Sequence, residues 1–243
     1  MSSNPPVPKL VIVTEVPDRA MVVFAHPDDA EIGSGGVVAT WIAAGCEVTY
    51  VLCTNGAAGT ADRALMPAEL VRKRADEQRA AADAMGVKHV VMLGYPDGEL
   101  EDTRQFLGDV VRAIRQYRPH TVFVHDPHRI HGFQHRDHRN AGIATTDAVY
   151  PYARDRLHFP EVLAEGLLPH KVRQVYLMGH DEPDTFLDIT PTIETKLAAL
   201  RCHRSQLKDF AAVEGRVRER AADLGKPHGY TYAESFRAVE LPR

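Results

Sequence analysis

Two groups of histidine and aspartate residues have the types and spacing to carry chemistry. The first is the segment HPDD, residues 26–29, which directly follows an apolar run. The second lies in residues 120–138, a window that holds six of the thirteen histidines and the motif HRDH. Neither window contains a cysteine. Imidazole and carboxylate without thiolate are typical ligands of a catalytic site for zinc or another divalent ion such as Fe²⁺.

The segments around these two groups must position them. Strands are indicated at residues 21–25, 47–54, 89–93 and 121–125, and helical patterns follow them at residues 35–44, 68–85, 103–117 and about 137–149. This alternation predicts βαβ units. We therefore expect an α/β fold with a Rossmann-like open sheet that is mostly parallel and has helices on both faces.

Both groups directly follow a predicted strand. In open α/β sheets, sites form outside the carboxyl ends of the strands. Either group alone has a structural explanation, as a helix cap or as satisfied polar side chains in a loop. Together they favour one shared cavity.

The last third of the chain is less regular. A strand at residues 174–178, helices at 191–203 and 213–224, and a final strand at 235–241 are expected there. No internal repeat or linker interrupts the pattern, so we expect a single domain over residues 1–243.

Composition excludes several classes of function. The chain of 243 residues has 44% hydrophobic residues and a formal net charge of −4, which predicts a globular protein that does not bind nucleic acid. The basic run at residues 72–74 is expected on a solvated helix face. Three cysteines without a CxxC pair indicate neither disulfides nor a thiolate zinc site, so a reducing cytoplasm is the expected compartment.

The sequence has no signal for export or membrane insertion. Its first ten residues lack a charged segment followed by an apolar one, and nowhere do 18 apolar residues run together. We expect neither export nor a membrane span. Whether the protein forms a homo-oligomer is left open by the sequence.

Several motifs carry a resemblance to a known family. AHPDD at residues 25–29 and HRDH at 135–138, with RxxE at 74–77 and LGYPDG at 93–98, resemble the zinc-dependent LmbE/PIG-L family of N-acetylglucosaminyl deacetylases. HRSQ at 203–206 and YAESF at 232–236 are also similar to that family. The resemblance covers residues 20–145 well and the rest in patches. AHPDD paired with a downstream HxDH is the specific signal.

The resemblance implies a metal site and a general base. His26, Asp29 and His138 would hold the ion, with Zn²⁺ expected, and Asp28 would be the base. Spacing is compatible with this, because residues three apart around a proline-containing turn can converge on one ion. The choice of His138 as ligand comes from the family alone.

The resemblance also assigns His135 and Asp137 to catalysis. His135, as an imidazolium, would stabilise the oxyanion, and Asp137 would orient it. Residues two apart do not face one another in a helix, so this pairing requires His135 to precede the helix. Many relatives have proline where this chain has Arg136, which adds a cation near the site.

Three further residues have competing interpretations. Arg74 and Asp97 match family positions that contact the sugar. Arg74 could instead form an exposed ion pair on a helix, and Asp97 lies in a Pro-Asp-Gly sequence that is typical of a turn. Many relatives have glutamate directly after the two aspartates, whereas Glu31 here follows Ala30. We expect Glu31 to place a negative charge in the first turn of a helix, where the helix dipole favours it, rather than to form a hydrogen bond with the histidines.

The implied reaction is hydrolysis of an N-acetyl or other N-acyl group on a small amino-sugar-containing molecule. Three other functions compete with it. GSGG at residues 33–36 suggests a nucleotide site, although its spacing misses GxGxxG. His135 and Asp137 with a distant histidine could form the facial triad of a non-haem iron enzyme. A non-catalytic sugar- or metal-binding module is the last alternative.

Overall fold

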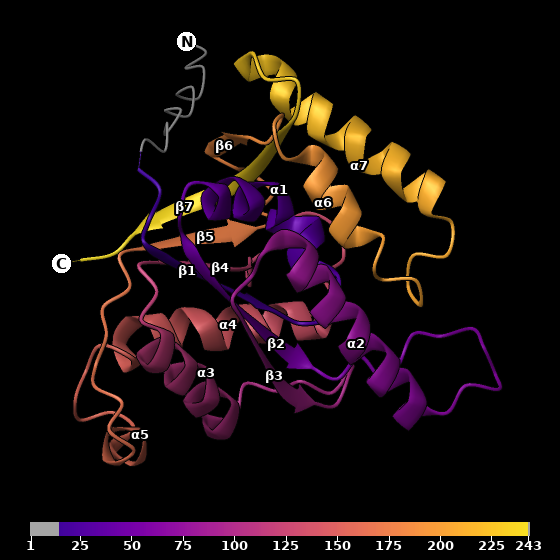
Figure 1. The fold of residues 1–243 in the computed structure, drawn as a ribbon. Helices are drawn as coiled ribbons and strands as arrows, with labels where there is room; N and C mark the ends of the chain where they lie inside the picture. Colours follow the sequence, from indigo (N-terminus) through magenta and orange to yellow (C-terminus); the bar gives the residue numbers. More distant parts are fainter. Residues whose placement is uncertain (1–14, 243) are drawn as a thin grey trace, which may run out of the picture.

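A seven-stranded sheet with helices on both faces forms the molecule (Figure 1). The computed structural model describes residues 15–242, so the N-terminal stretch behind the expectation of no export lies outside the described residues. The strands are β1 (Arg19–Phe24), β2 (Glu47–Thr54), β3 (His89–Tyr95), β4 (Thr121–His125), β5 (Gln174–Met178), β6 (Thr185–Asp188) and β7 (Ala233–Glu240). Their order in the sheet is β3-β2-β1-β4-β5-β7-β6.

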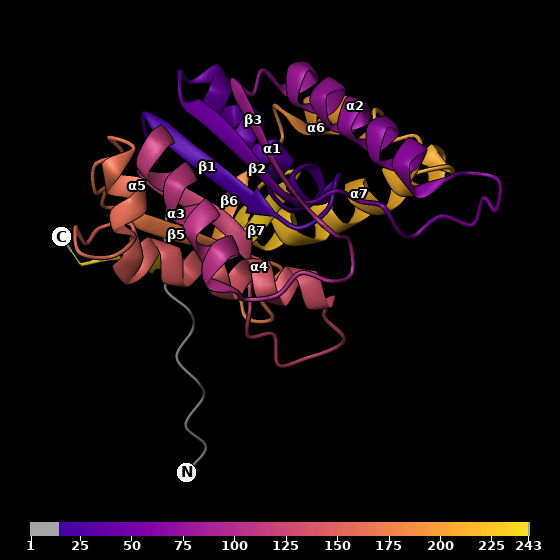
Figure 2. The same ribbon diagram turned by 90° about the horizontal axis from the view of Figure 1, so that it is seen from below.

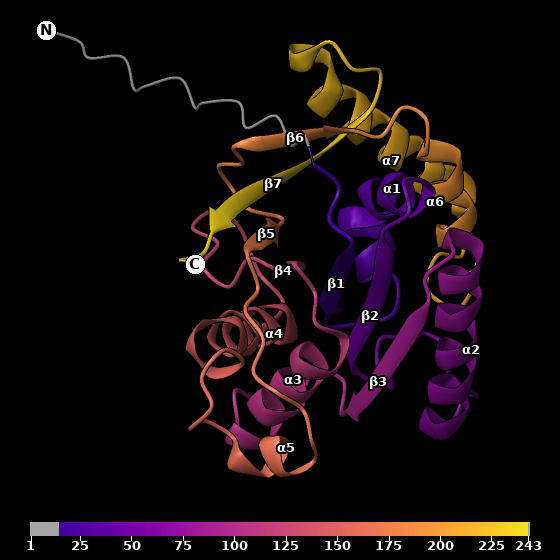
Figure 3. The same ribbon diagram turned by 60° about the vertical axis from the view of Figure 1, so that its left-hand side comes forward.

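Seven α-helices connect the strands within residues 15–242. They are α1 (Asp29–Ala43), α2 (Pro67–Met85), α3 (Arg104–Tyr117), α4 (Arg136–Asp147), α5 (Pro160–Ala164), α6 (Ile193–Leu200) and α7 (Phe210–Gly225), with single helical turns η1 (Ala148–Tyr152) and η2 (Lys226–His228). Figures 2 and 3 show α1, α2, α6 and α7 on one face of the sheet and α3, α4 and α5 on the other. The predicted α/β fold with a mostly parallel sheet is confirmed.

Two apolar cores fill the space between the sheet and its helices. Side chains alternate along β1, so Val22 and Phe24 enter the core under α1 and α2, while Met21 and Val23 enter the core under α3 and α4. Strands β1 to β5 are parallel neighbours, and only β7 runs antiparallel to β5 and β6. The carboxyl ends of the five parallel strands therefore lie at one edge.

Helix α1 begins earlier than its sequence pattern predicts. We expected a helix from residue 35, but α1 begins at Asp29. The glycines at residues 33–36 look like a loop in sequence, yet they let α1 pack closely, because a Cβ on Gly36 would lie 2.6 Å from side-chain atoms of Ile189. GSGG is thus inside a helix rather than at its N-terminus, and the nucleotide-site interpretation is wrong.

Other helix ends follow their local chemistry. Pro67 is the first residue of α2, and Gly86 ends it with a φ of 81°. Thr103 caps α3 by accepting the N–H of Phe106. Within residues 15–242, no helix has the length and apolar content needed to cross a membrane.

Candidate metal and catalytic site

Five polar residues meet at the carboxyl edge of the sheet. His26 follows β1 and His125 ends β4, while Asp97 follows β3. His138 lies in the first turn of α4, and Asp29 is the first residue of α1. Both groups predicted from the sequence therefore belong to one site.

His26, Asp29 and His138 form a compact group of potential metal ligands. His26 Nδ1 lies 3.2 Å from His138 Nε2 and 3.4 Å from Asp29 Oδ2. Asp29 Oδ2 is 3.2 Å from His138 Nε2. Two imidazole nitrogens and a carboxylate oxygen at these separations can converge on one divalent ion.

The second nitrogen of His26 points into a neighbouring group. His26 Nε2 lies 3.1 Å from Asp137 Oδ2 and 3.2 Å from Asp97 Oδ1. His135 completes this group, so ligand atoms of four residues lie close together. Asp137 is fully buried and also accepts the backbone N–H of Gly98 at 2.7 Å. His26 therefore joins both groups through opposite sides of its ring.

The site carries an excess of negative charge, which suits a cation. Burial alone lowers the pKa of His26, but hydrogen bonds to Asp29 and Asp97 outweigh it and raise the pKa to about 10. Burial, then the charges of Asp29 and Glu31, raise the pKa of Asp28 well above its usual range. Both shifts are expected where several carboxylates are crowded together in a buried site, so the donor set fits a divalent ion.

Asp28 is held in an unusual conformation beside the ligands. It is the N-cap of α1, is buried, and has a φ of 87°, which non-glycine residues rarely adopt. Its backbone N–H donates to Gln78 Oε1 at 3.3 Å. Gln206 Nε2 donates to Asp28 Oδ2 at 3.1 Å and to Pro27 O at 2.9 Å. Gln78 thus holds the backbone of Asp28, and Gln206 holds its carboxylate, next to the proposed ion.

A buried polar network stands behind Asp28. Glu31 is fully buried, with Oε2 3.1 Å from His203 Nε2, while Oε1 accepts from Gln78 Nε2 at 3.0 Å. The expectation that Glu31 only charges a helix end is wrong, because its side chain turns inward to bond these groups. Its histidine partner is His203, outside the two predicted groups.

His135 and Asp137 are arranged differently from the prediction. His135 does precede α4, as its N-cap, and its Nδ1 accepts the backbone N–H of Asp137 at 3.1 Å. The Asp137 carboxylate instead contacts His26, so it orients that ring and not His135. Burial and the nearby His26 lower the pKa of His135, which favours a neutral ring over the expected imidazolium.

Arg74 is buried instead of lying on a solvated face. Its guanidinium donates to Gly56 O at 2.6 Å and Ala58 O at 2.8 Å and lies 3.7 Å from Asp97 Oδ2. Asp97 Oδ2 in turn accepts the N–H of Ala58 at 3.0 Å. The exposed ion-pair interpretation is therefore wrong, and the expected solvated face holds for Arg72 and Lys73 alone. Arg74 and Asp97 together stabilise the loop after β2, which lies beside the site.

His125 belongs to the site, although neither spacing nor the family resemblance assigned it an individual role. Its ring stacks on His138, with centroids 3.9 Å apart and planes 7° apart. Its Nε2 lies 3.3 Å from Asp29 Oδ2. Position at the end of β4 is the signal that could have identified it, since the same position identified the HPDD segment. Of the same window, His128 and His131 are exposed.

Comparisons with known proteins agree on one family. Residues 21–149 match the family model PIG-L, described as GlcNAc-PI de-N-acetylase. The chain is 34% identical to diacetylchitobiose deacetylase of Thermococcus kodakarensis, over 91% of this chain and 83% of that one. It resembles the structure of N,N′-diacetylchitobiose deacetylase from Pyrococcus horikoshii, with a TM-score of 0.87 and 32% identity over 92% of this chain and 84% of that one.

A third comparison shows the fold alone. The 4-carboxy-2-hydroxymuconate hydratase GalB from Pseudomonas putida is 24% identical, with a TM-score of 0.78 over 93% of this chain and 97% of that one. The architecture thus occurs with other activities, so the site must carry the functional argument.

Proposed function

The chain belongs to the PIG-L family, and we propose that it is a metal-dependent hydrolase that removes an N-acetyl group from a small amino-sugar-containing molecule. The observation that carries the proposal is the convergence of His26, Asp29 and His138, with Asp28 beside them. Relatives named for diacetylchitobiose and N-acetylglucosaminyl malate support the substrate class. A purely metal-binding module would have no use for a base held as Asp28 is.

We propose that His26 Nδ1, Asp29 and His138 hold one divalent ion, Zn²⁺ in the first instance. His26 supports this choice, because metal-bound histidines usually donate their other ring N–H to a carboxylate, and its Nε2 faces Asp137 and Asp97. The group around His135 is the competing facial triad. Asp137 suits that role less well, because its oxygens already accept backbone N–H groups.

The residues around the proposed ligands have different roles in the reaction. A bound divalent ion would lower the pKa of a water molecule to about 7 and polarise the acetyl carbonyl. Asp28 accepts the proton of the attacking water through the oxygen that Gln206 does not hold. His135 Nε2–H donates to the oxyanion, since its Nδ1 already accepts a backbone N–H. Proton return to the nitrogen breaks the amide bond and releases acetate and the free amine.

Metal content and turnover of two neighbouring variants test this assignment. Asp28→Asn should keep the metal and lose about 10²-fold to 10⁴-fold in kcat, the usual contribution of a general base. Asp29→Ala should instead lower metal affinity. Elemental analysis gives the metal, and acetate release from N,N′-diacetylchitobiose gives the rate. Equal loss of metal in both variants would contradict the division of roles.

The substrate class has its own test. Protein loaded with Zn²⁺, Fe²⁺ or Co²⁺ is incubated with a panel of N-acylated amino sugars, and the released amine is measured. We expect amine from at least one N-acetylglucosaminyl compound. A panel without turnover, in protein that contains one metal per chain, would reject the amino-sugar substrate while leaving the metal site intact.

A further inference from the structure

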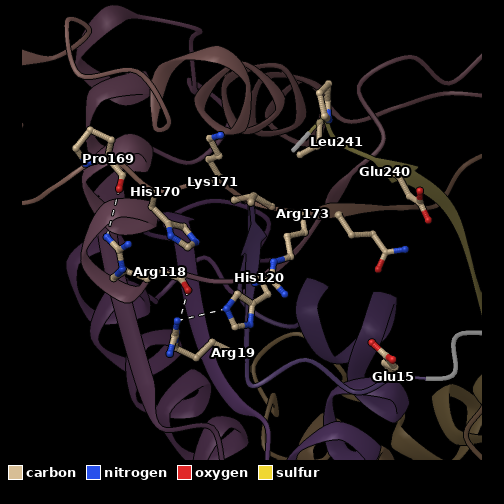
Figure 4. A pocket seen from close by; sticks show the side chains of 13 residues that line it. Glu15, Arg19, Arg118, His120, Pro169, His170, Lys171, Arg173, Glu240 and Leu241 are labelled. Carbon is tan, nitrogen blue, oxygen red and sulfur yellow. Dashed lines mark hydrogen bonds between the residues drawn. The ribbon is translucent and has the colours of Figure 1, made fainter.

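A large cavity lies at the sheet edge opposite the catalytic site. Its volume is about 1030 Å³ (Figure 4). Its frame is formed by Arg19, which begins β1, His120 before β4, and Arg173 before β5. Because these strands are parallel, their amino ends are separated from the catalytic edge by a strand length, roughly 17–20 Å. The cavity is therefore independent of the proposed deacetylase site.

Backbone hydrogen bonds hold the floor of this cavity rigidly. His120 N–H donates to Arg19 O at 2.9 Å, and Arg173 N–H donates to His120 O at 2.8 Å. Leu241 N–H donates to Arg173 O at 2.9 Å. The backbone that carries these three basic residues is thus ordered at adjacent strand ends before any ligand binds. Such preorganisation lowers the entropic cost of binding.

The cavity concentrates positive charge in a chain whose formal net charge is −4. Arg19, Arg118, Lys171 and Arg173 line it, and none of them forms an ion pair with a residue among those the structure describes. Backbone carbonyls hold two of the guanidiniums, since Arg19 Nε donates to Arg118 O at 2.9 Å and Arg118 Nη1 donates to Pro169 O at 3.4 Å. Arg19 Nη2 also lies 3.5 Å from His120 Nε2. Arg118 Nη2 and Nε donate to no residue among those the structure describes, so they can bind a ligand.

His120 lies between Arg19 and Arg173 at this edge. Burial, followed by the charges of Arg173 and Arg19, lowers the pKa of its imidazole. Asp18 opposes this effect from 3.8 Å but does not outweigh it. Around the His120 imidazole, the positive charges of the two arginines therefore outweigh the negative charge of Asp18.

The opposite end of the cavity has a different character. Figure 4 shows Glu15 and Glu240 on the right, away from Arg118 on the left. Their carboxylates can accept hydrogen bonds from hydroxyl or ammonium groups. Val172 and Leu241 add apolar surface to the lining. A ligand suited to the whole cavity has an anionic group at one end and a hydroxylated body at the other.

We propose that this cavity binds a phosphorylated polyol of sugar size, with the phosphate among Arg19, Arg118, Lys171 and Arg173. Guanidinium groups match the oxygens of a phosphate dianion, and several together suit its charge. Inorganic phosphate would leave most of the cavity unfilled. The organic body therefore contributes contacts with the glutamate end.

Calorimetric titration of the metal-loaded protein with glucose 6-phosphate tests this proposal. Lys171→Gln with Arg173→Gln removes two exposed cations whose side chains form no hydrogen bond or ion pair among the described residues. Arg72→Gln with Lys73→Gln is the matched control, because it removes one arginine and one lysine from an exposed face of α2. Thermal melts confirm that both double variants are folded.

We expect saturable binding of glucose 6-phosphate to the unaltered protein, with inorganic phosphate at least about tenfold weaker and no binding of glucose. The cavity variant should weaken binding by at least about tenfold, as expected for lost charge-assisted hydrogen bonds. The control variant should bind unchanged. Three outcomes would overturn the proposal: no saturable binding at millimolar concentration, equal affinity for glucose, or binding that the cavity variant retains.

Discussion

Gln206, in the loop after α6, contacts the proposed catalytic base. It donates to Asp28 Oδ2, so it selects which oxygen faces the water. Gln206→Met keeps the approximate shape and removes the donor. We expect kcat to fall by about 10²-fold through misplacement of the base, with KM and metal content unchanged.

Steady-state kinetics and elemental analysis check this prediction. Gln105→Met, in an exposed position of α3, is the matched control and should leave kcat unaltered. A rise in KM with unchanged kcat in Gln206→Met would instead assign Gln206 to substrate binding.

His135 and His138 share a motif but should differ in phenotype. His138→Ala removes a proposed ligand, so the purified variant should contain less metal. His135→Ala should keep the metal and lose about 10²-fold to 10³-fold in kcat, the effect of removing one oxyanion donor. Metal analysis beside kinetics separates them. Metal loss confined to His135→Ala would favour the facial-triad alternative.

The sequence predicts the residues at this site that lie in short motifs. The apolar strands placed both motifs at the carboxyl edge of the sheet, and the family resemblance selected His26, Asp29 and His138, whose ligand atoms lie close together. Gln78 and Glu31 could not be predicted, since their importance comes from burial between α1 and α2, which no spacing reveals. The neutral state favoured for His135 depends on neighbours brought together by the fold.

At the scale of elements, one buried ion pair joins α6 to β7 and α1. Lys196 Nζ lies 2.6 Å from Glu234 Oε1, and both side chains are 5% exposed. Glu234 also accepts the N–H of Gly36 at 2.8 Å and of Val37 at 2.9 Å, inside α1. The YAESF motif is therefore a structural connection between the last strand and the helix that begins at Asp29.

Removal of one partner should leave a buried, unpaired charge. Lys196→Met is expected to lower the free energy of unfolding by about 3–5 kcal/mol. The pair Lys88–Glu47 is the control, because the Lys88 side chain is 60% exposed, and Lys88→Met should cost about 0–1 kcal/mol. Urea denaturation measures both. Similar losses in the two variants would show that the buried pair contributes no special stability.

Short elements mark the limit of prediction at this scale. Every strand with two neighbours in the sheet was predicted from its apolar residues, whereas β6, of four residues at the sheet edge, was not. Helix α5 has five residues, too few to show helical periodicity. The single domain over residues 1–243 remains a prediction.

At the scale of the whole molecule, His170 couples stability to pH. It is buried, and its Nε2–H donates to Pro119 O at 2.7 Å. Burial lowers the pKa of His170 from 6.5 to about 4. The unfolded chain therefore takes up a proton at this residue before the folded protein does, and stability is lost as pH falls from about 6.5 towards 4.

His170→Gln removes this titration and keeps an amide donor. Between pH 7 and about 4, the unaltered protein should lose up to about 3 kcal/mol more free energy of unfolding than the variant does. Urea denaturation across this range measures the difference. The exposed His128→Gln should follow the unaltered protein, and a parallel loss in all three proteins would exclude His170 as the cause.

Because β7 lies between β5 and β6, the sheet cannot be completed during synthesis until β7 has been made. Strands β1 to β5 have all their partners among one another except at the β5 edge, so they can pair before the rest is made, but β6 pairs with β7, which follows α6 and α7 in the chain. Until Ala233–Glu240 is synthesised, β5 presents an open edge to other nascent chains. Premature termination after α7 would therefore release a chain that contains the motif histidines but has an unpaired, aggregation-prone β5 edge. Such a chain is expected to be bound by chaperones or degraded by proteases.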